Sequence, residues 1–214
     1  MPQQFGVYLV TDAALSGERS TPEIVDAAIE GGVDIVQLRE KGESAIDRYE
    51  TGLEVRELTE AAGIPLVVND RIDIADAIGA DGVHLGDDDL PISAAREQLG
   101  PDAIVGRSVS TPDAAREAER AGADYLGVGA VYGTTSKETT PAQSEIGLER
   151  VRAIREATEL PFVGIGGVTP ENASEIVAAG ADGVAVISAI TEASDPTAAT
   201  RRLADAVTEV SVDA

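Results

Sequence analysis

The chain lacks cysteine and has only two lysines, and long hydrophobic runs are also missing. Without cysteine it can form neither a disulfide framework nor a thiolate metal site or nucleophile. No apolar stretch approaches the length that spans a membrane, and the N-terminus MPQQFGVYLVTD has no basic segment followed by an apolar core. We therefore expect a cytoplasmic protein with no membrane partner.

The balance of charge is strongly negative, with 39 acidic residues against 16 basic ones and a net charge of −23 over 214 residues. Such a charge disfavours nucleic acid and anionic membranes as partners. Scarce lysine, abundant acids and an aromatic content of 3% are similar to the composition of proteins adapted to high salt. An anionic substrate would then need local cations or a bound metal ion to overcome the field of the whole molecule.

A Gly-x-Asp unit in which x is valine or alanine occurs four times, each time directly before a short apolar run, at 32–34, 79–81, 122–124 and 180–182. Glycine suits the residue that ends a helix, so each unit predicts a helix, a turn and then a strand. Four further apolar runs alternate with these units, one before each, at 5–10, 65–68, 103–105 and 161–165. Helices are predicted in the gaps, at about 22–30, 45–62, 71–78, 92–99, 112–120, 147–158, 171–179 and 196–209.

Alternating strands and helices predict a parallel sheet, and eight such units predict an α/β fold, a single (β/α)8 TIM barrel over 1–214 with a frayed C-terminus. An open, doubly wound sheet is the main alternative. The recurrence of the Gly-x-Asp unit before alternate strands favours the closed barrel. Threonine precedes proline at 21–22, 111–112 and 169–170, and each pair predicts a helix start capped by the threonine.

An amide and two cations lie at the end of the predicted strand at 34–38 and directly after it. Gln37, Arg39 and Lys41 alternate along an extended backbone, so all three can project to one side. Two cations and an amide suit a phosphate ester that carries a ring. The alternative is an ordinary solvated strand end.

In barrels of this kind the functional site forms where the strands end. Asn69 and Asp70 follow the third strand, and three consecutive aspartates, 87–89, follow the fourth. Neighbouring parallel strands lie roughly 4.8 Å apart, so carboxylates at these two ends can share one hard cation such as Mg²⁺. A solvated acidic loop is the alternative.

The later strand ends suggest phosphate binding. Ser108 follows the fifth strand, and Lys137 lies in the long connection from Tyr132 to about Ile146, which could close over the barrel mouth. Glycines at 166–167 and a serine at 188 follow the seventh and eighth strands, the usual phosphate site of the fold. The single histidine, His84, lies in mid-strand and is expected to pack inside the barrel in a structural role.

Together these segments resemble the thiamine phosphate synthase family. The matching strings are YLVTD (8–12), QLREKG (37–42), NDRIDIADAIGADGVHLGDDDLP (69–91), GADYLGVGAVYGTTSK (122–137), GIGGVTPEN (164–172) and GADGVAVISAI (180–190). They span nearly the whole chain in the order of the family. The resemblance implies that a pyrimidine diphosphate is joined to a thiazole phosphate, with or without a carboxylate, and that pyrophosphate is released.

The resemblance also implies roles for individual residues. The pyrimidine diphosphate would be bound by Gln37, Leu38, Arg39, Glu40, Lys41, Asn69, Ser108 and Lys137. Mg²⁺ would be bound by Asp70 and Asp89, and the thiazole phosphate by Thr134, Thr135, Ser136, Gly166, Gly167, Ile187 and Ser188. The catalytic residues would be Arg39, Lys41, Lys137 and Ser108, which stabilise charge on the departing pyrophosphate.

Two positions depart from the family pattern. Gly133 stands where proline often precedes the threonine of the lid, and Ser108-Val109-Ser110 stands where Ser-x-His is common. A thiazole tautomerase of the same superfamily relies on a histidine in this neighbourhood, so Ser110 argues against that alternative. A non-catalytic barrel that binds thiamine phosphate is the other alternative. The expected partners are phosphorylated small molecules, and homo-oligomer formation is left open.

Overall fold

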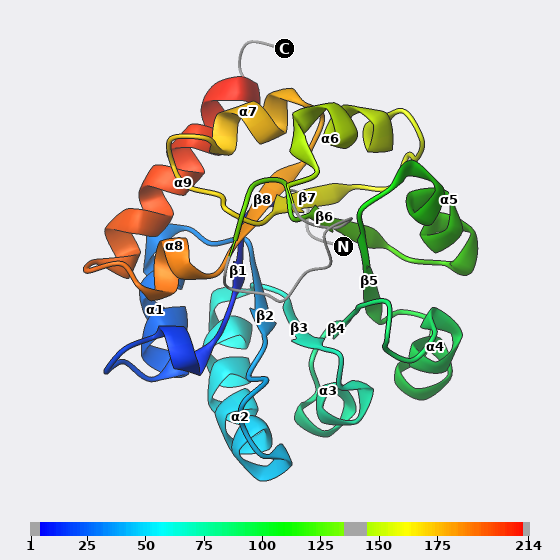
Figure 1. Ribbon diagram of the computed structural model, residues 1–214. Coiled ribbons are helices and arrows are strands. Elements are labelled where there is room, and N and C mark those ends of the chain that lie inside the picture. The colour runs from blue at the N-terminus through cyan, green and yellow to red at the C-terminus, as the bar shows by residue number, and fades with distance from the viewer. Residues whose placement is uncertain (1–4, 135–144, 212–214) are drawn as a thin grey trace.

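The computed structural model describes residues 5–134 and 145–211. Eight parallel strands form a barrel in chain order, and β1 pairs with β8 to close it (Figure 1). The strands are β1 (Gly6–Val10), β2 (Ile35–Leu38), β3 (Leu66–Asn69), β4 (Gly82–Leu85), β5 (Ile104–Val109), β6 (Tyr125–Gly129), β7 (Phe162–Ile165) and β8 (Gly183–Val186). The predicted TIM barrel is confirmed and the open sheet is excluded.

Helices surround the strands, as Figure 1 shows in a view down the barrel. They are α1 (Thr21–Gly31), α2 (Ala45–Ala62), α3 (Ile72–Ile78), α4 (Ile92–Leu99), α5 (Pro112–Ala121), α6 (Gly147–Arg155), α7 (Ala173–Ala178), α8 (Ser188–Thr191) and α9 (Pro196–Ser211). The sequence did not predict α8 or the 3-10 turn η1 (Ala13–Leu15), because elements this short show no periodicity. Within the described part of the chain, none of the helices has the length and apolar character needed to cross a bilayer.

The prediction that Thr21 caps α1 is wrong. Ser20 is the cap, and it forms a capping box in which the Ser20 hydroxyl accepts from the Glu23 backbone while the Glu23 carboxylate accepts from the Ser20 N–H. Thr21 is already helical and buried, and its hydroxyl points to another partner. The sequence Ser-Thr-Pro-Glu fits either residue as cap, and the Glu three positions after Ser20 is the signal that decides between them.

The other two Thr-Pro pairs have different outcomes. Thr111 caps α5 as predicted, because its hydroxyl accepts from the Ala114 N–H. Thr169 does not cap α7, which begins only at Ala173, and instead the Thr169 N–H donates to the Asn172 side chain at 2.8 Å. A turn therefore separates β7 from its helix.

The four Gly-x-Asp units have a common structural role at the N-terminal end of the barrel. In each unit the aspartate that enters an even-numbered strand accepts the backbone N–H at the start of the preceding odd-numbered strand. The pairs are Asp34 with Val7, Asp81 with Leu66, Asp124 with Val105 and Asp182 with Phe162, at 2.7–2.9 Å. The repeat therefore links the strands in pairs at the N-terminal end of the barrel.

Buried side chains form two groups, one on each face of the barrel wall. The larger group packs the outer faces of the strands against the helices. The smaller one fills the barrel interior and consists of Phe5, Tyr8, Val10, Ile35, Val67, Tyr125, Val163, Ala185 and Ile187. Period-two alternation along each strand separates these groups, and it also decides which strand-end residues face the interior.

Candidate active site

A cavity of about 550 Å³ opens at the C-terminal ends of the strands. Residues from seven of the eight strands and their following loops line it, so the cavity lies where the fold places its functional sites. Of the residues singled out from the sequence, the lining includes Arg39, Lys41, Asn69, Asp70, Asp89, Ser108, Thr134, Gly166, Gly167, Ile187 and Ser188. The structure therefore brings together both halves of the predicted site.

Some predicted site residues lie elsewhere. Gln37, Leu38 and Glu40 are buried and are not among the lining residues. Thr135, Ser136 and Lys137 lie outside the described residues, so their roles stay predictions. Ser108 does not follow β5 but lies within it. The strand continues to Val109 and is therefore longer than the apolar run from which it was predicted.

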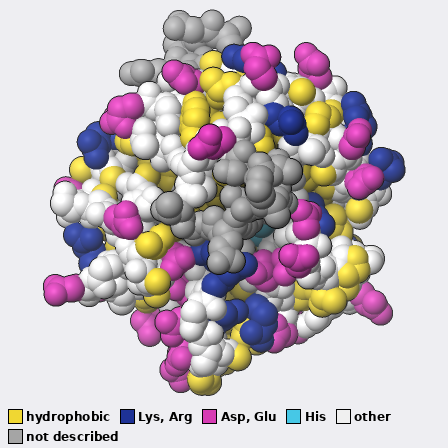
Figure 2. All heavy atoms as spheres, viewed as in Figure 1, with side chains coloured by type: hydrophobic (Ala, Val, Ile, Leu, Met, Phe, Trp, Pro, Cys, Tyr) yellow, Lys and Arg dark blue, Asp and Glu magenta, His cyan; other side chains and the backbone are white. Residues whose placement is uncertain are grey.

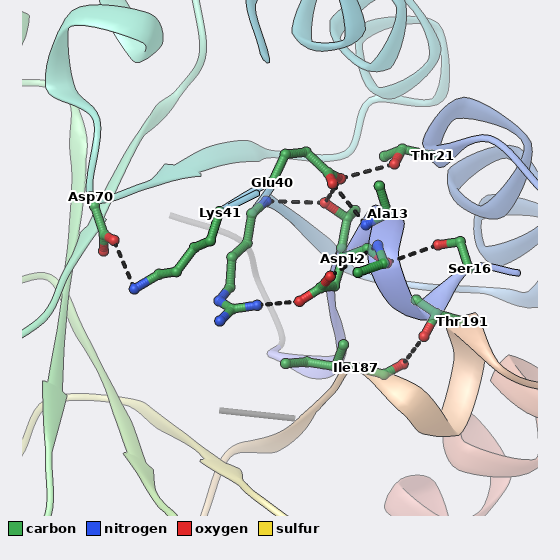
Figure 3. A network of polar contacts seen from close by, with 12 residues as sticks. Asp12, Ala13, Ser16, Thr21, Glu40, Lys41, Asp70, Ile187 and Thr191 are labelled. Atoms are coloured by element: carbon green, nitrogen blue, oxygen red, sulfur yellow. Dashed lines mark hydrogen bonds and ion pairs between the residues drawn. The ribbon is translucent and has the colours of Figure 1, made fainter. Parts of the chain in front are cut away.

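Glu40 anchors the loop after β1 rather than facing the cavity. Its carboxylate accepts hydrogen bonds from the Thr11 hydroxyl at 2.7 Å, the Ala13 N–H at 2.7 Å and the Thr21 hydroxyl at 2.8 Å. Figure 3 shows Glu40 directed toward these residues and Lys41 directed the other way. A buried carboxylate needs such donors, so Glu40 fixes the positions of β2, the β1 loop and the start of α1 relative to one another.

Arg39 reaches the cavity with its guanidinium held by one carboxylate. Its Nη1 donates to Asp12 Oδ2 at 2.5 Å, and the Arg39 side chain is only 9% exposed. Asp12 is itself fixed, because its Oδ1 accepts from the Ala14 N–H as the cap of η1. The pair places a planar cation, suited to phosphate oxygens, at a defined point of the cavity wall.

Lys41 is the more accessible cation. Its Nζ lies 3.1 Å from Asp70 Oδ2, and its side chain is 51% exposed. Asp70 has a φ of 63°, in the left-handed region, so the backbone turns sharply directly after β3. Lys41 can exchange the Asp70 oxygen for a ligand oxygen at small cost, because the pair is open to solvent.

Asp70 and Asp89 lie close enough to affect each other's pKa, although they are 19 positions apart in the sequence. Burial alone would raise the pKa of Asp70, but the hydrogen bond with Asp89 and the Lys41 ammonium outweigh it and hold the pKa below its ordinary value. Burial and the adjacent Asp70 raise the pKa of Asp89. Two carboxyl groups this close repel each other when both are ionised, and a divalent cation would relieve that repulsion.

The carboxylate pair fits Mg²⁺ better than it fits a metal enclosed by protein ligands. Among the residues that the structure describes, no group of three or more His, Asp or Glu side chains is placed to hold a metal ion. Mg²⁺ is commonly held by one or two carboxylates together with water and substrate phosphates. Asp89 also accepts the Gly86 N–H at 2.6 Å, and Arg107 donates to the Gly86 carbonyl at 2.5 Å, so the loop that carries Asp89 is fixed.

The opposite wall of the cavity is built from the loops after β7 and β8. Gly166 and Gly167 have φ values of 101° and 63°, which favour glycine. A Cβ at Gly167 would lie 2.6 Å from the Gly133 carbonyl and 2.8 Å from the Tyr132 Cβ, so glycine also permits close backbone approach. Ile187 and Ser188 lie beside this turn at the end of β8.

Sequence reasoning missed several lining residues that are small rather than polar. Gly127, Gly129 and Ala130 come from β6 and its end, and Ala185 comes from β8. A Cβ at Gly127 would lie 3.0 Å from His84 Cε1 and a Cβ at Gly129 would overlap Ile165, so these two glycines permit close approach of neighbouring groups. The string Gly-Val-Gly-Ala at 127–130 carried the signal, since glycine at alternate strand positions indicates close approach of other groups.

The fold and the cavity define a class of protein: a TIM-barrel enzyme for phosphorylated small molecules, with cations on one wall, a carboxylate pair beside them and a glycine turn opposite. Figure 2 shows acidic side chains distributed widely over the same face of the molecule. Arg39 and Lys41 thus place two cations in the cavity of a chain whose net charge is −23.

Comparison with known proteins identifies the family. The family model for thiamine monophosphate synthase matches residues 7–190. Thiamine-phosphate synthases of Natronomonas pharaonis and Haloquadratum walsbyi are 75% and 61% identical, over 97% and 96% of this chain and 97% and 92% of their own. The solved thiamine phosphate pyrophosphorylase of Pyrococcus furiosus has a TM-score of 0.88 at 42% identity, with 96% of each chain covered. The chain belongs to the thiamine-phosphate synthase family, and its haloarchaeal relatives accord with the salt-adapted composition.

Proposed function

We propose that the protein joins 4-amino-2-methyl-5-hydroxymethylpyrimidine diphosphate to a thiazole phosphate, and so forms thiamine monophosphate and pyrophosphate. The observation that carries the proposal is that one cavity contains Arg39, Lys41, the Asp70–Asp89 pair and the glycine turn at 166–167. Family membership supports the same reaction. We further propose that it acts in the cytoplasm.

The reaction is a displacement at the methylene carbon of the pyrimidine. The bond between this carbon and the diphosphate oxygen breaks, and its electron pair leaves with pyrophosphate. The lone pair of the thiazole nitrogen then forms the new carbon–nitrogen bond. The ring stabilises the cation formed in between, so the reaction requires no protein nucleophile, and the absence of cysteine from the chain is no obstacle.

The residues of this chain would act mainly on the leaving group. Arg39 is held in place by Asp12 and would bind the diphosphate oxygens through its fixed guanidinium. Lys41 would move from Asp70 to the diphosphate as negative charge develops there. Ser108 would donate a further hydrogen bond from the cavity wall. Lys137, predicted from the sequence to close over the site, would add a third cation.

Asp70 and Asp89 would hold Mg²⁺, which supplies positive charge to the phosphate oxygens when bound. Fixing of the Asp89 loop by Arg107 keeps the two carboxylates together. On the opposite wall, the glycine turn, Ile187 and Ser188 would bind the thiazole phosphate, and so would Thr134.

The test is an assay of pyrophosphate release with both substrates, Mg²⁺ and enough salt to keep the protein folded. We expect pyrophosphate and thiamine monophosphate in equal amounts, and no thiamine monophosphate when the thiazole is omitted. Conversion of a carboxylated thiazole phosphate to an isomer without pyrophosphate release would instead indicate the tautomerase. Binding of thiamine monophosphate without any turnover would indicate a non-catalytic barrel. Ser110 lines the cavity near the position where the tautomerase relies on histidine, which favours the synthase.

A further inference from the structure

A continuous chain of hydrogen bonds crosses the barrel interior beneath the cavity. Gln37 Nε2 donates to the Tyr8 hydroxyl at 2.7 Å, and the Tyr8 and Tyr125 hydroxyl oxygens lie 2.8 Å apart. His84 Nδ1 lies 2.9 Å from the Tyr125 hydroxyl, and His84 Nε2 lies 3.0 Å from Ser108 Oγ. Since Ser108 lines the cavity, the chain leads from a buried amide to the cavity wall.

The surrounding strands make room for this chain. A Cβ at Gly106 would overlap the Tyr125 ring, and a Cβ at Gly127 would lie 3.0 Å from His84 Cε1. Tyr8 and Tyr125 are each 1% exposed and His84 is 8% exposed. Such groups are buried only where their polar atoms have hydrogen-bond partners, so this chain of hydrogen bonds is a structural requirement of the barrel interior.

The direction of the hydrogen bonds follows from the amide at one end. Gln37 donates to Tyr8, and one donor order then gives each phenol both a donor and an acceptor, with Tyr8 donating to Tyr125 and Tyr125 donating to His84 Nδ1. Burial raises the pKa of both phenols, so both keep their protons. An imidazole that accepts at Nδ1 carries its proton on Nε2 in the neutral form.

We propose that His84 is a positioning residue whose Nε2–H donates to Ser108 Oγ and thereby directs the Ser108 proton into the cavity. With its oxygen engaged by His84, the Ser108 hydroxyl acts on a ligand chiefly as a donor. A donor suits an anionic oxygen, so the interior chain prepares the wall for phosphate. The role of the Ser108 hydroxyl as a donor to phosphate rests on the function proposed above. The assignment of the His84 tautomer is independent of that function.

The first test determines which imidazole nitrogen carries the proton. His84 is the only histidine in the chain, so untagged protein labelled with ¹⁵N gives a single imidazole in a long-range ¹H–¹⁵N correlation spectrum. We expect the neutral Nε2–H form at pH 7.5 without any substrate. The Nδ1–H tautomer or a doubly protonated ring would overturn the proposal. This readout does not depend on turnover, so it remains decisive even if no pyrophosphate is released.

A variant that keeps the imidazole tests the polarity of the chain. Tyr125→Phe removes the proton donor to His84 Nδ1 and is expected to yield a detectable fraction of the Nδ1–H tautomer. Tyr49→Phe, on helix α2, is the matched control and should leave the imidazole signals unchanged. An unchanged tautomer in Tyr125→Phe would show that the chain does not set the proton position.

The second test asks whether His84 acts through Ser108. We expect His84→Phe and Ser108→Ala each to lower kcat/KM for the pyrimidine diphosphate about tenfold, and the double variant to be no worse than twofold below Ser108→Ala. His84→Gln, whose amide can still donate to Ser108, should recover most of the loss. Multiplicative losses in the double variant would mean that His84 acts independently of Ser108 and would refute the positioning role. Should His84→Phe not fold, His84→Gln and the tautomer experiment carry the test.

Discussion

Two neighbouring residues, Arg39 and Glu40, show how side-chain direction separates function from support. Arg39 points into the cavity, whereas Glu40 points away from it and accepts three hydrogen bonds. Their charges are opposite and both are buried, so each requires its own partners. The partner of Arg39 is Asp12, one residue from the Thr11 that contacts Glu40, so one short loop fixes both.

Glu40→Gln should destabilise the protein by about 2 kcal/mol, because an amide group replaces an acceptor that faces three donors. The loss should appear in the free energy of unfolding measured with denaturant. Glu43→Gln, at an exposed position three residues further along, is the control and should change stability by less than about 0.5 kcal/mol. Equal effects of the two substitutions would contradict the anchoring role of Glu40.

Asp89→Asn should abolish turnover and the response of turnover to added Mg²⁺, because one of two proposed metal ligands is lost. Pyrophosphate release across a series of Mg²⁺ concentrations measures both effects. Asp102→Asn changes the net charge equally at an exposed site before β5 and should behave like the unsubstituted protein. Activity that persists in the presence of a chelator would disprove the metal assignment.

At the scale of the elements, the recurring aspartate holds pairs of strands together. Three of the four also accept from an arginine of a preceding helix: Asp81 from Arg56, Asp124 from Arg96 and Asp182 from Arg155. No ion pair to Asp34 occurs among the described residues. Burial, opposed by the hydrogen bond from the Val7 N–H, raises the pKa of Asp34.

Asp81→Asn should lower the free energy of unfolding by about 1 kcal/mol, because the amide oxygen can still accept the Leu66 N–H but the ion pair with Arg56 is lost. Asp34→Asn should not lower it at pH 7, because the amide oxygen can still accept the Val7 N–H and no ion pair among the described residues is lost. Denaturant unfolding of both variants measures the difference. A larger loss for Asp34→Asn would mean that the charge itself is needed at the strand entry.

The raised pKa of Asp34 also predicts a pH dependence. The folded chain binds this proton more tightly than the unfolded chain, so the contribution of Asp34 to stability decreases as the pH rises from the unfolded pKa through the raised folded one. Asp34→Asn should remove that slope. Unfolding free energies measured between about pH 4 and 7 would show the two proteins diverging toward higher pH, and parallel curves would contradict the assignment.

For the whole molecule, the charge of −23 sets the conditions under which the barrel is stable. Acidic side chains are scattered over the face in Figure 2, and repulsion among the excess of acidic groups favours expansion of the chain. The interior does not share this character, because Glu40 is the one acidic side chain buried among the described residues. Solvent ions therefore act on the surface rather than on the core.

Raising KCl from about 0.1 M to about 1 M should raise the melting temperature, because the screening length falls from roughly 10 Å to roughly 3 Å. Circular dichroism melts over this range provide the measurement. The same series with the uncharged solute sucrose separates screening from general exclusion of solutes. A melting temperature that is constant or falls with KCl would contradict repulsion as the main effect of the charge.

Several features of the structure could be predicted from local sequence alone. The Gly-x-Asp repeat and the apolar runs between the units gave the number and order of strands, because burial on both faces of a parallel strand leaves a continuous apolar run. The cations after β2 were recognisable because they are unusual in an acidic chain, and the glycines after β7 because this fold commonly binds phosphate there. Thr21 was misassigned because two adjacent residues could cap α1.

Tertiary structure alone decided which of these side chains meet. The pairing of Asp70 with Asp89, the withdrawal of Gln37 and Glu40 from the cavity and the contact of His84 with Ser108 each depend on residues from different strands or from the loops that follow them. Strand position within a closed barrel and the alternation of faces set these contacts, and neither is encoded in any single segment. The sequence by itself thus determined which elements form and which chemical groups are available, while the closing of the barrel determined where those groups point.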